Sequence, residues 1–173
     1  IKNSFLDEIN NLNFKDTDLS VRFGSDNKNN VSASGNYSIN NRDYHYYNLK
    51  NNFFKDSSYL NLDFEFAQKL KIDFINYKKD DGITAKILLD INTKKESINI
   101  NELQYKENKN LIKFEKVKIN KKNLISLKKI QVKTYKKKDL KNDFVLDFGK
   151  KIIINGSKYD AKNLNKYLNQ KSK

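Results

Sequence analysis

Residues 60–66 read Leu-Asn-Leu-Asp-Phe-Glu-Phe, so that apolar and polar side chains alternate strictly. Residues 83–91 repeat the pattern, with one parity occupied by Ile83, Ala85, Ile87, Leu89 and Ile91. A period of two is the period of a β-strand, in which successive side chains point to opposite faces. Each segment is therefore predicted to be a strand with one apolar face and one wet face.

The same alternation recurs along most of the chain. It is found at 31–39, 70–74, 98–100, 103–105, 112–114, 117–119, 125–127, 130–132, 144–148 and 152–154. Together these segments predict about a dozen strands, and their single wet face is typical of antiparallel sheets. Turn residues separate them at 24–27, 40–41, 80–82, 93–95, 107–110 and 136–139. The expected order is a meander of hairpins, with Asp81-Gly82 as a candidate two-residue turn.

Two segments have helical spacing instead. Apolar residues between Phe5 and Leu12 recur at three and four residues, which predicts a short N-terminal helix. Near the other end, Asp160 is placed to cap a helix whose apolar face runs from Leu164 to Leu168. We therefore expect a mainly β segment over residues 1–156, followed by a short helix and linker over 157–173.

Composition limits the classes of protein that are compatible with this chain. Hydrophobic residues make up 37%, with 10 Tyr and 11 Phe, which is enough to cover a sheet and argues against disorder throughout. The absence of cysteine excludes disulfides and thiolate metal sites. The chain begins at Ile1 and contains no methionine, so we expect it to be a piece of a longer protein. No apolar run approaches the roughly 18 residues of a membrane-spanning helix.

The net charge of +14 is unevenly distributed. Residues 1–100 carry 14 Lys and Arg against 14 Asp and Glu, whereas residues 101–173 carry 21 against 7. The basic half could contact an anionic membrane surface or nucleic acid, or its lysines could serve as a solubilising wet face. This half contains no arginine, and Phe114, Phe144 and Phe148 lie on the apolar parity, which argues against a nucleic-acid reader.

Candidate catalytic residues are few. His45 is the single histidine, and without a second His or Cys we interpret it as an ordinary strand or loop residue. Several carboxylates lie on the polar parity of their strands and are expected to be solvated cross-strand partners of lysine. They are Asp63, Glu65, Asp73, Asp90 and Asp147. Five scattered glycines form no phosphate-binding loop, so we expect neither cofactor, metal nor enzymatic activity.

The alternating face has two interpretations that periodicity does not separate. It could be one layer of a closed sandwich or barrel that packs on itself. It could instead be the concave side of an open, curved sheet that carries lipid chains. Both arrangements need one apolar parity on every strand.

Residues 150–164, KKIIINGSKYDAKNL, resemble a passage of AsmA-like proteins, particularly of the large YhdP-type branch. That passage is an apolar strand followed by glycine, an aromatic residue, aspartate and a spaced leucine. Residues 12–19, 31–37 and 127–135 are similar to the amphipathic strands of the same family. The resemblance spans most of the chain and includes no catalytic residue.

The resemblance implies a membrane-anchored, periplasmic bridge protein of bacteria with two membranes. Such proteins form long repeating β-grooves through which phospholipids pass from the inner to the outer membrane. The family's N-terminal membrane helix and C-terminal partner-binding region are missing here, which implies an internal fragment. The implied partners are phospholipid acyl chains and, through the missing flanking regions, bacterial membranes; nucleic acid is not expected.

A groove for acyl chains needs a continuous apolar lining, because each shielded CH₂ contributes about 0.8 kcal/mol. The expected lining residues are Leu60, Leu62, Phe64, Phe66, Ile72, Phe74, Ile83, Ile87, Leu89, Ile91, Ile98 and Ile100. The main alternative is a β-sandwich binding or adhesion module whose apolar faces pack together. A basic nucleic-acid-binding protein ranks last.

Overall fold

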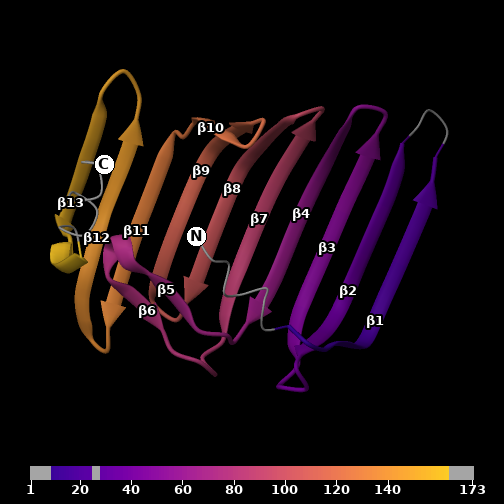
Figure 1. Cartoon of the computed structure of the whole chain (residues 1–173), viewed down its shortest axis with the longest axis horizontal. Coiled ribbons are helices and arrows are strands. Elements are labelled where there is room, and N and C mark those ends of the chain that lie inside the picture. Colours follow the sequence, from indigo (N-terminus) through magenta and orange to yellow (C-terminus); the bar gives the residue numbers. More distant parts are fainter. Residues whose placement is uncertain (1–8, 25–27, 164–173) are drawn as a thin grey trace.

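The fold is dominated by one large, open antiparallel sheet. The computed structural model describes residues 9–24 and 28–163. Eleven strands form the main sheet, and a separate hairpin forms a second sheet of two strands. The two outermost strands of the main sheet do not pair with each other, so the sheet does not close (Figure 1).

The strands follow the alternating segments of the sequence. Their bounds are β1 Leu12–Phe23, β2 Asn29–Ile39, β3 His45–Phe54, β4 Ser57–Phe66, β5 Leu70–Ile72, β6 Tyr77–Lys79, β7 Ala85–Lys94, β8 Ser97–Glu107, β9 Asn110–Asn120, β10 Asn123–Ser126, β11 Lys129–Lys136, β12 Asp139–Phe148 and β13 Ile152–Lys158.

The order of strands in the main sheet is the order of the chain. It runs β1-β2-β3-β4-β7-β8-β9-β11-β12-β13, with β10 pairing beside β11 along β9. The predicted antiparallel meander is therefore confirmed. A closed sandwich is not what the described residues form, since only a hairpin faces the main sheet (Figure 1).

Tight turns join most neighbouring strands. Asn40 and Asn41 both have positive φ, 55° and 58°, between β2 and β3, and asparagine tolerates this left-handed conformation. Lys121 and Lys122 adopt the same geometry between β9 and β10, with φ of 47° and 67°. The predicted two-residue hairpin at Asp81-Gly82 is wrong, because it connects β6 to β7 and these strands belong to different sheets.

Strands β1 and β8 each contain an extra residue that moves the apolar parity from one set of positions to the other. In β1, Asp16 and Thr17 together lie opposite Gly35, and Asp16 has a φ of 49°. In β8 the pairing with β7 shifts between Asp90 and Ile91. These β-bulges keep the apolar side chains on one face of the sheet although their spacing in the sequence changes.

The inserted hairpin covers one end of the apolar face. It consists of β5, the 3₁₀ turn η2 (Asp73–Ile75) and β6, and in Figure 1 it overlies the lower ends of the orange strands. Between the hairpin and the main sheet lies a buried apolar cluster to which both contribute: Phe66, Ile75, Tyr77, Ala85, Tyr105, Ile112, Val132 and Phe144. The strand predicted over 70–74 ends at Ile72, because η2 turns the chain back over the sheet.

The two predicted helices are not supported. Residues 9–11 are not helical and β1 begins at Leu12, while the rest of the N-terminal prediction lies outside the described residues. At the other end, Asp160 Oδ1 accepts a hydrogen bond from the Lys162 amide, as expected of a cap. That cap begins only the 3₁₀ turn η3 (Ala161–Asn163), and the residues from 164 onward also lie outside the described part.

Candidate functional site

Nine of the twelve predicted lining residues lie on one face of the main sheet. Leu60 pairs with Ile91, which pairs with Ile100 on the next strand. Leu62 pairs with Leu89 in the same way, and Phe64 with Ile87. Phe66 and Ile98 extend the face to either side. Directly paired residues of an antiparallel sheet share a face, so β4, β7 and β8 together present a continuous apolar surface.

The other three predicted residues lie elsewhere. Ile72 belongs to β5 and packs on the buried cluster as part of the cover. Phe74 lies in η2, where its ring contacts Tyr159 at 5.9 Å between centroids. Ile83 is exposed in the loop before β7. These three residues therefore do not belong to the main sheet, because the chain leaves that sheet between Phe66 and Ala85.

The central feature of this face is an unbroken line of apolar side chains across ten strands. Each member pairs directly with the next, from one edge strand to the other. We call it the apolar row, and its members are Leu19, Ala33, Leu49, Leu62, Leu89, Leu103, Phe114, Ile130, Leu146 and Ile154. At about 4.8 Å between strands, the row is roughly 43 Å long.

The apolar row remains accessible from one side. Its eight interior members are half-buried, because neighbouring side chains on the same face shield them laterally. The two end members are more exposed, at 67% for Leu19 and 68% for Ile154, since each has a neighbouring strand on one side only. Contiguous apolar surface of this kind marks an interaction site in a folded protein.

A buried polar network holds the covering hairpin in place beside the row. The Tyr77 hydroxyl donates to Glu107 Oε2 at 2.7 Å and lies 2.6 Å from the Tyr105 hydroxyl. Asn110 Nδ2 donates to the same carboxylate oxygen. Burial raises the pKa of Tyr105 to about 12 and raises the pKa of Tyr77 further, so both hydroxyls stay protonated donors. The network satisfies Glu107 and pins β6 to β8.

Two further side chains anchor the cover. Asn142 on β12 is fully buried; its Nδ2 donates to the Ile75 carbonyl and to Thr134 Oγ1, and its Oδ1 accepts from the Asp160 amide. Lys79 is 1% exposed and donates to the carbonyls of Ala67 and Gln68, both at 2.7 Å. Desolvation lowers the pKa of Lys79. These contacts fix the hairpin as a wall beside the part of the row that lies on β8, β9, β11 and β12.

The parallel line on the other side of the row is less uniform. Val31, Leu60, Ile91 and Ile100 continue the apolar surface there, but Asn51 lies between Val31 and Leu60. Its Oδ1 is a buried acceptor without a hydrogen-bond partner. The apolar surface is therefore continuous along the row and interrupted beside it.

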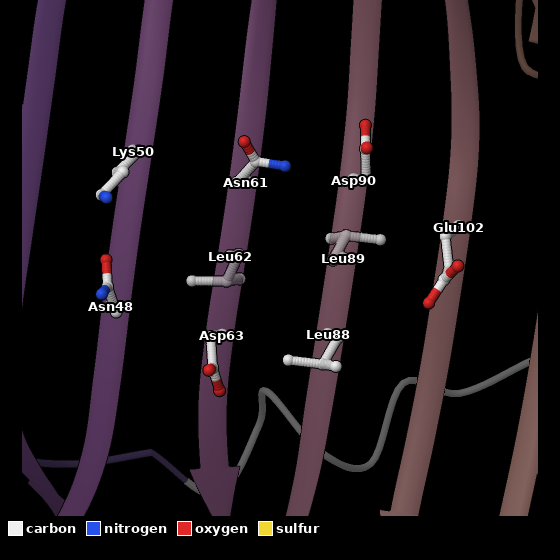
Figure 2. A pocket seen from close by; sticks show the side chains of 9 residues that line it. All are labelled: Asn48, Lys50, Asn61, Leu62, Asp63, Leu88, Leu89, Asp90 and Glu102. Atoms are coloured by element: carbon white, nitrogen blue, oxygen red, sulfur yellow. The ribbon is translucent and has the colours of Figure 1, made fainter.

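The opposite face is polar and contains a hollow of about 470 Å³ on β3, β4, β7 and β8, of which Figure 2 shows the lining side chains. Asp63 forms an ion pair with Lys86 at 2.9 Å, which raises the pKa of Lys86. Asp90 accepts from the Tyr59 hydroxyl and from Asn101 Nδ2, both at 2.8 Å. The carboxylates of the hollow are thus engaged with neighbours on their own face.

The other predicted carboxylates behave similarly. Asp73 forms an ion pair with Lys71 at 2.7 Å, and Asp147 pairs in register with Lys129. His45 begins β3 and lies on the apolar face opposite Tyr37, away from the hollow. Within the described ranges, no group of three or more His, Cys, Asp and Glu side chains could hold a metal ion.

Sequence reasoning nominated only two of the ten members of the apolar row, Leu62 and Leu89. Alternation did identify Ala33, Leu103, Phe114, Ile130, Leu146 and Ile154 as strand residues. Their membership in one row depends on register, which a single sequence does not contain. Leu49 was missed altogether, because β3 mixes Tyr, Asn and Lys around it.

Comparison of the chain with protein-family models, with curated proteins and with solved structures gives no match. Among the described residues, no helix has the length and apolar content needed to cross a membrane.

Proposed function

We propose that the apolar row binds the acyl chains of phospholipids, and that the chain is a non-enzymatic segment of a lipid-transfer bridge. The observation that carries the proposal is the pairing of apolar side chains across ten strands of the main sheet on a face that stays accessible. The resemblance to AsmA-like, YhdP-type proteins supports the same function. On that basis we place the segment in the periplasm, attached to the inner membrane through flanking regions and leading towards the outer membrane.

The dimensions of the row suit hydrocarbon. One leaflet of a bilayer has a hydrocarbon thickness of about 15 Å, half of the roughly 30 Å core. A row of roughly 43 Å is long enough for more than one lipid tail end to end. Each CH₂ that leaves water for the row contributes about 0.8 kcal/mol, so partial shielding of one tail is a substantial driving force.

The position of the hairpin favours a trough-shaped binding surface over a flat one. It rises from one side of the row and is held there by Tyr77, Lys79 and Asn142. A tail that lies along the row on β8, β9, β11 and β12 would have this wall on one side. Movement along the row would meet only Leu, Ile, Phe and Ala side chains, so the energy of a bound tail would change little from strand to strand.

Two adjacent leucines on β7 provide a matched experiment. Leu89 pairs with Leu62 in the apolar row, whereas Leu88 pairs with Asp63 and so points to the opposite face. Leu89→Asn and Leu88→Asn make the same chemical change on the same strand. The probe is a phosphatidylcholine with a fluorescent acyl chain, whose emission rises when the tail leaves water.

Leu89→Asn should weaken binding of this probe by about fivefold, equivalent to roughly 1 kcal/mol of lost apolar contact. Leu88→Asn should leave it unchanged. Phospholipid that co-purifies with the chain, detected by mass spectrometry, should decrease in parallel. The proposal fails if both variants bind the probe equally well, or if the unaltered chain does not bind it at all while circular dichroism shows the intact sheet.

A further inference from the structure

We propose that one end of the main sheet docks edge-on into the interface of an anionic phospholipid membrane. The contact consists of four turns, which we call the lysine rim: 55–56, 95–96, 121–122 and 149–151. This inference does not depend on what the apolar row binds.

The strand pairing brings these turns to the same end of the sheet. Ser57 pairs with Lys94, and Ser97 pairs with Asn120. The Phe148 amide donates to the Lys128 carbonyl, which brings the turn after β12 to the same end. In Figure 1 all four turns lie along the upper border, opposite the end that the hairpin covers.

The charge of the lysine rim is strongly positive. Its four turns contain six lysines and two acids, Asp56 and Glu96. The turns 40–44, 80–84, 108–109 and 137–138 at the other end contain four cations and three acids. Lysines held near an anionic leaflet attract it, and each contributes about a fivefold gain in membrane partitioning. The positive field is therefore concentrated at one end of the sheet.

Exposed apolar side chains are interleaved with these lysines. The strand ends at or next to the rim carry Phe23, Phe53, Phe54, Leu124, Ile125, Ile152 and Ile153, with exposed fractions between 39% and 83%. Phe53 and Phe54 are consecutive in β3, and Ile152 and Ile153 are consecutive in β13, so each pair presents one side chain to each face. Apolar groups on both faces suit insertion of the edge, whereas a groove would need them on one face only.

A hollow at the rim adds room for a headgroup. It has a volume of about 440 Å³ and is lined by Lys128, Lys150 and Lys151, with Phe148, Asp147 and Ile153 among its other residues. Cationic groups above an apolar floor match a phosphate ester attached to an acyl chain. Edge-on docking would hold the strands upright on the membrane and place the apolar row parallel to its surface, so it is an alternative to an arrangement in which the row leads away from that membrane.

The charge contribution can be tested with two lysine pairs in turns at opposite ends of the sheet. Lys150→Glu/Lys151→Glu alters the rim, and Lys137→Glu/Lys138→Glu makes the same charge change at the other end. Co-sedimentation uses vesicles of phosphatidylglycerol with phosphatidylcholine, and vesicles of phosphatidylcholine alone. The rim variant should lose at least tenfold in binding to the anionic vesicles, beyond the loss in the control variant.

Insertion can be tested with tryptophan, because the chain contains none. Phe54→Trp places the only indole at the rim, and Tyr44→Trp places it at the opposite end. On anionic vesicles the Phe54→Trp emission should shift to the blue and be quenched by brominated acyl chains, while the Tyr44→Trp emission should not change.

Three results would overturn the inference. The first is an equal loss of vesicle binding in both lysine variants. The second is vesicle binding without any shift of the Phe54→Trp emission. The third is displacement of the chain from vesicles by random oligonucleotides, together with no quenching of the tryptophan by brominated acyl chains. Failure of the acyl-chain proposal is distinguishable from failure of this inference, because Leu89→Asn should abolish neither vesicle binding nor the emission shift.

Discussion

Replacement of Asn142 by leucine tests how the hairpin is held over the apolar face. Asn142 is fully buried on β12 and bonds to three different segments. Its side chain reaches the Ile75 carbonyl at 2.9 Å, Thr134 Oγ1 at 2.8 Å and the Asp160 amide at 2.9 Å. Leucine has a similar shape but can neither donate nor accept.

The expected cost follows from these three bonds. Each neutral hydrogen bond contributes about 1 kcal/mol, and a buried backbone group left without a partner costs about 1–3 kcal/mol. Because Asn142→Leu removes partners from the Ile75 carbonyl and the Asp160 amide, we expect a loss of roughly 3–5 kcal/mol. That is a large fraction of the roughly 5–15 kcal/mol that stabilises an ordinary domain.

Equilibrium unfolding in urea, followed by far-ultraviolet circular dichroism, measures the free energy of unfolding. Hydrogen exchange of the amides in β5, η2 and β6 reports whether the hairpin detaches first. Asn92→Leu, on an exposed position of β7, is the control and should change stability by less than about 0.5 kcal/mol. If Asn142→Leu costs less than about 1 kcal/mol and the hairpin amides keep their protection, these hydrogen bonds do not hold the cover.

Three further predictions concern other parts of the sheet. Lys121→Asn/Lys122→Gly should raise the unfolding free energy by about 1–2 kcal/mol, because both lysines have left-handed φ; an unchanged urea midpoint would contradict this. Gly156→Ala should release β13 and deprotect its amides in hydrogen exchange, since an added Cβ would lie 2.5 Å from Phe144 Cβ; retained protection would contradict it. The pKa of Tyr105 is raised to about 12, so folding holds its proton above the ordinary value of about 10. The stabilisation from this shift should be complete below pH 10, and the free energy of unfolding should fall between about pH 10 and 12. Urea unfolding across this range should show a smaller fall for Tyr105→Phe.

The strands were predictable because alternation records burial directly. Residues 60–66 and 85–91 appear in the structure within β4 and β7, which pair side by side. Antiparallel order was predictable too, since each strand has one wet face and short turns follow it. The openness of the sheet was not predictable, because a closed sandwich would use the same pattern.

The failures have particular physical causes. Residues 70–74 alternate like a strand, but Asn76 adopts a positive φ of 50° and the chain folds back over the sheet as a cover. The N-terminal segment shows helical spacing up to Leu12, yet pairing with β2 makes Leu12 the first residue of a strand. In both cases tertiary pairing overrides a short local pattern.

The bulges explain why the sequence does not reveal the continuous apolar face. The alternation of apolar and polar residues changes parity within single strands. Alternation changes parity between Ile100 and Leu103, and again between Phe114 and Val117, so each pair of segments resembles two separate strands. In the structure each is one strand, and Lys116 in β9, with a φ of 53°, lies opposite the shift in β8. If only one of the two strands changed parity, Leu103 and Phe114 could not pair on the same face as Ile100 and Val117. The continuity of the apolar surface therefore depends on polar residues placed opposite each other, which no count of apolar residues would identify.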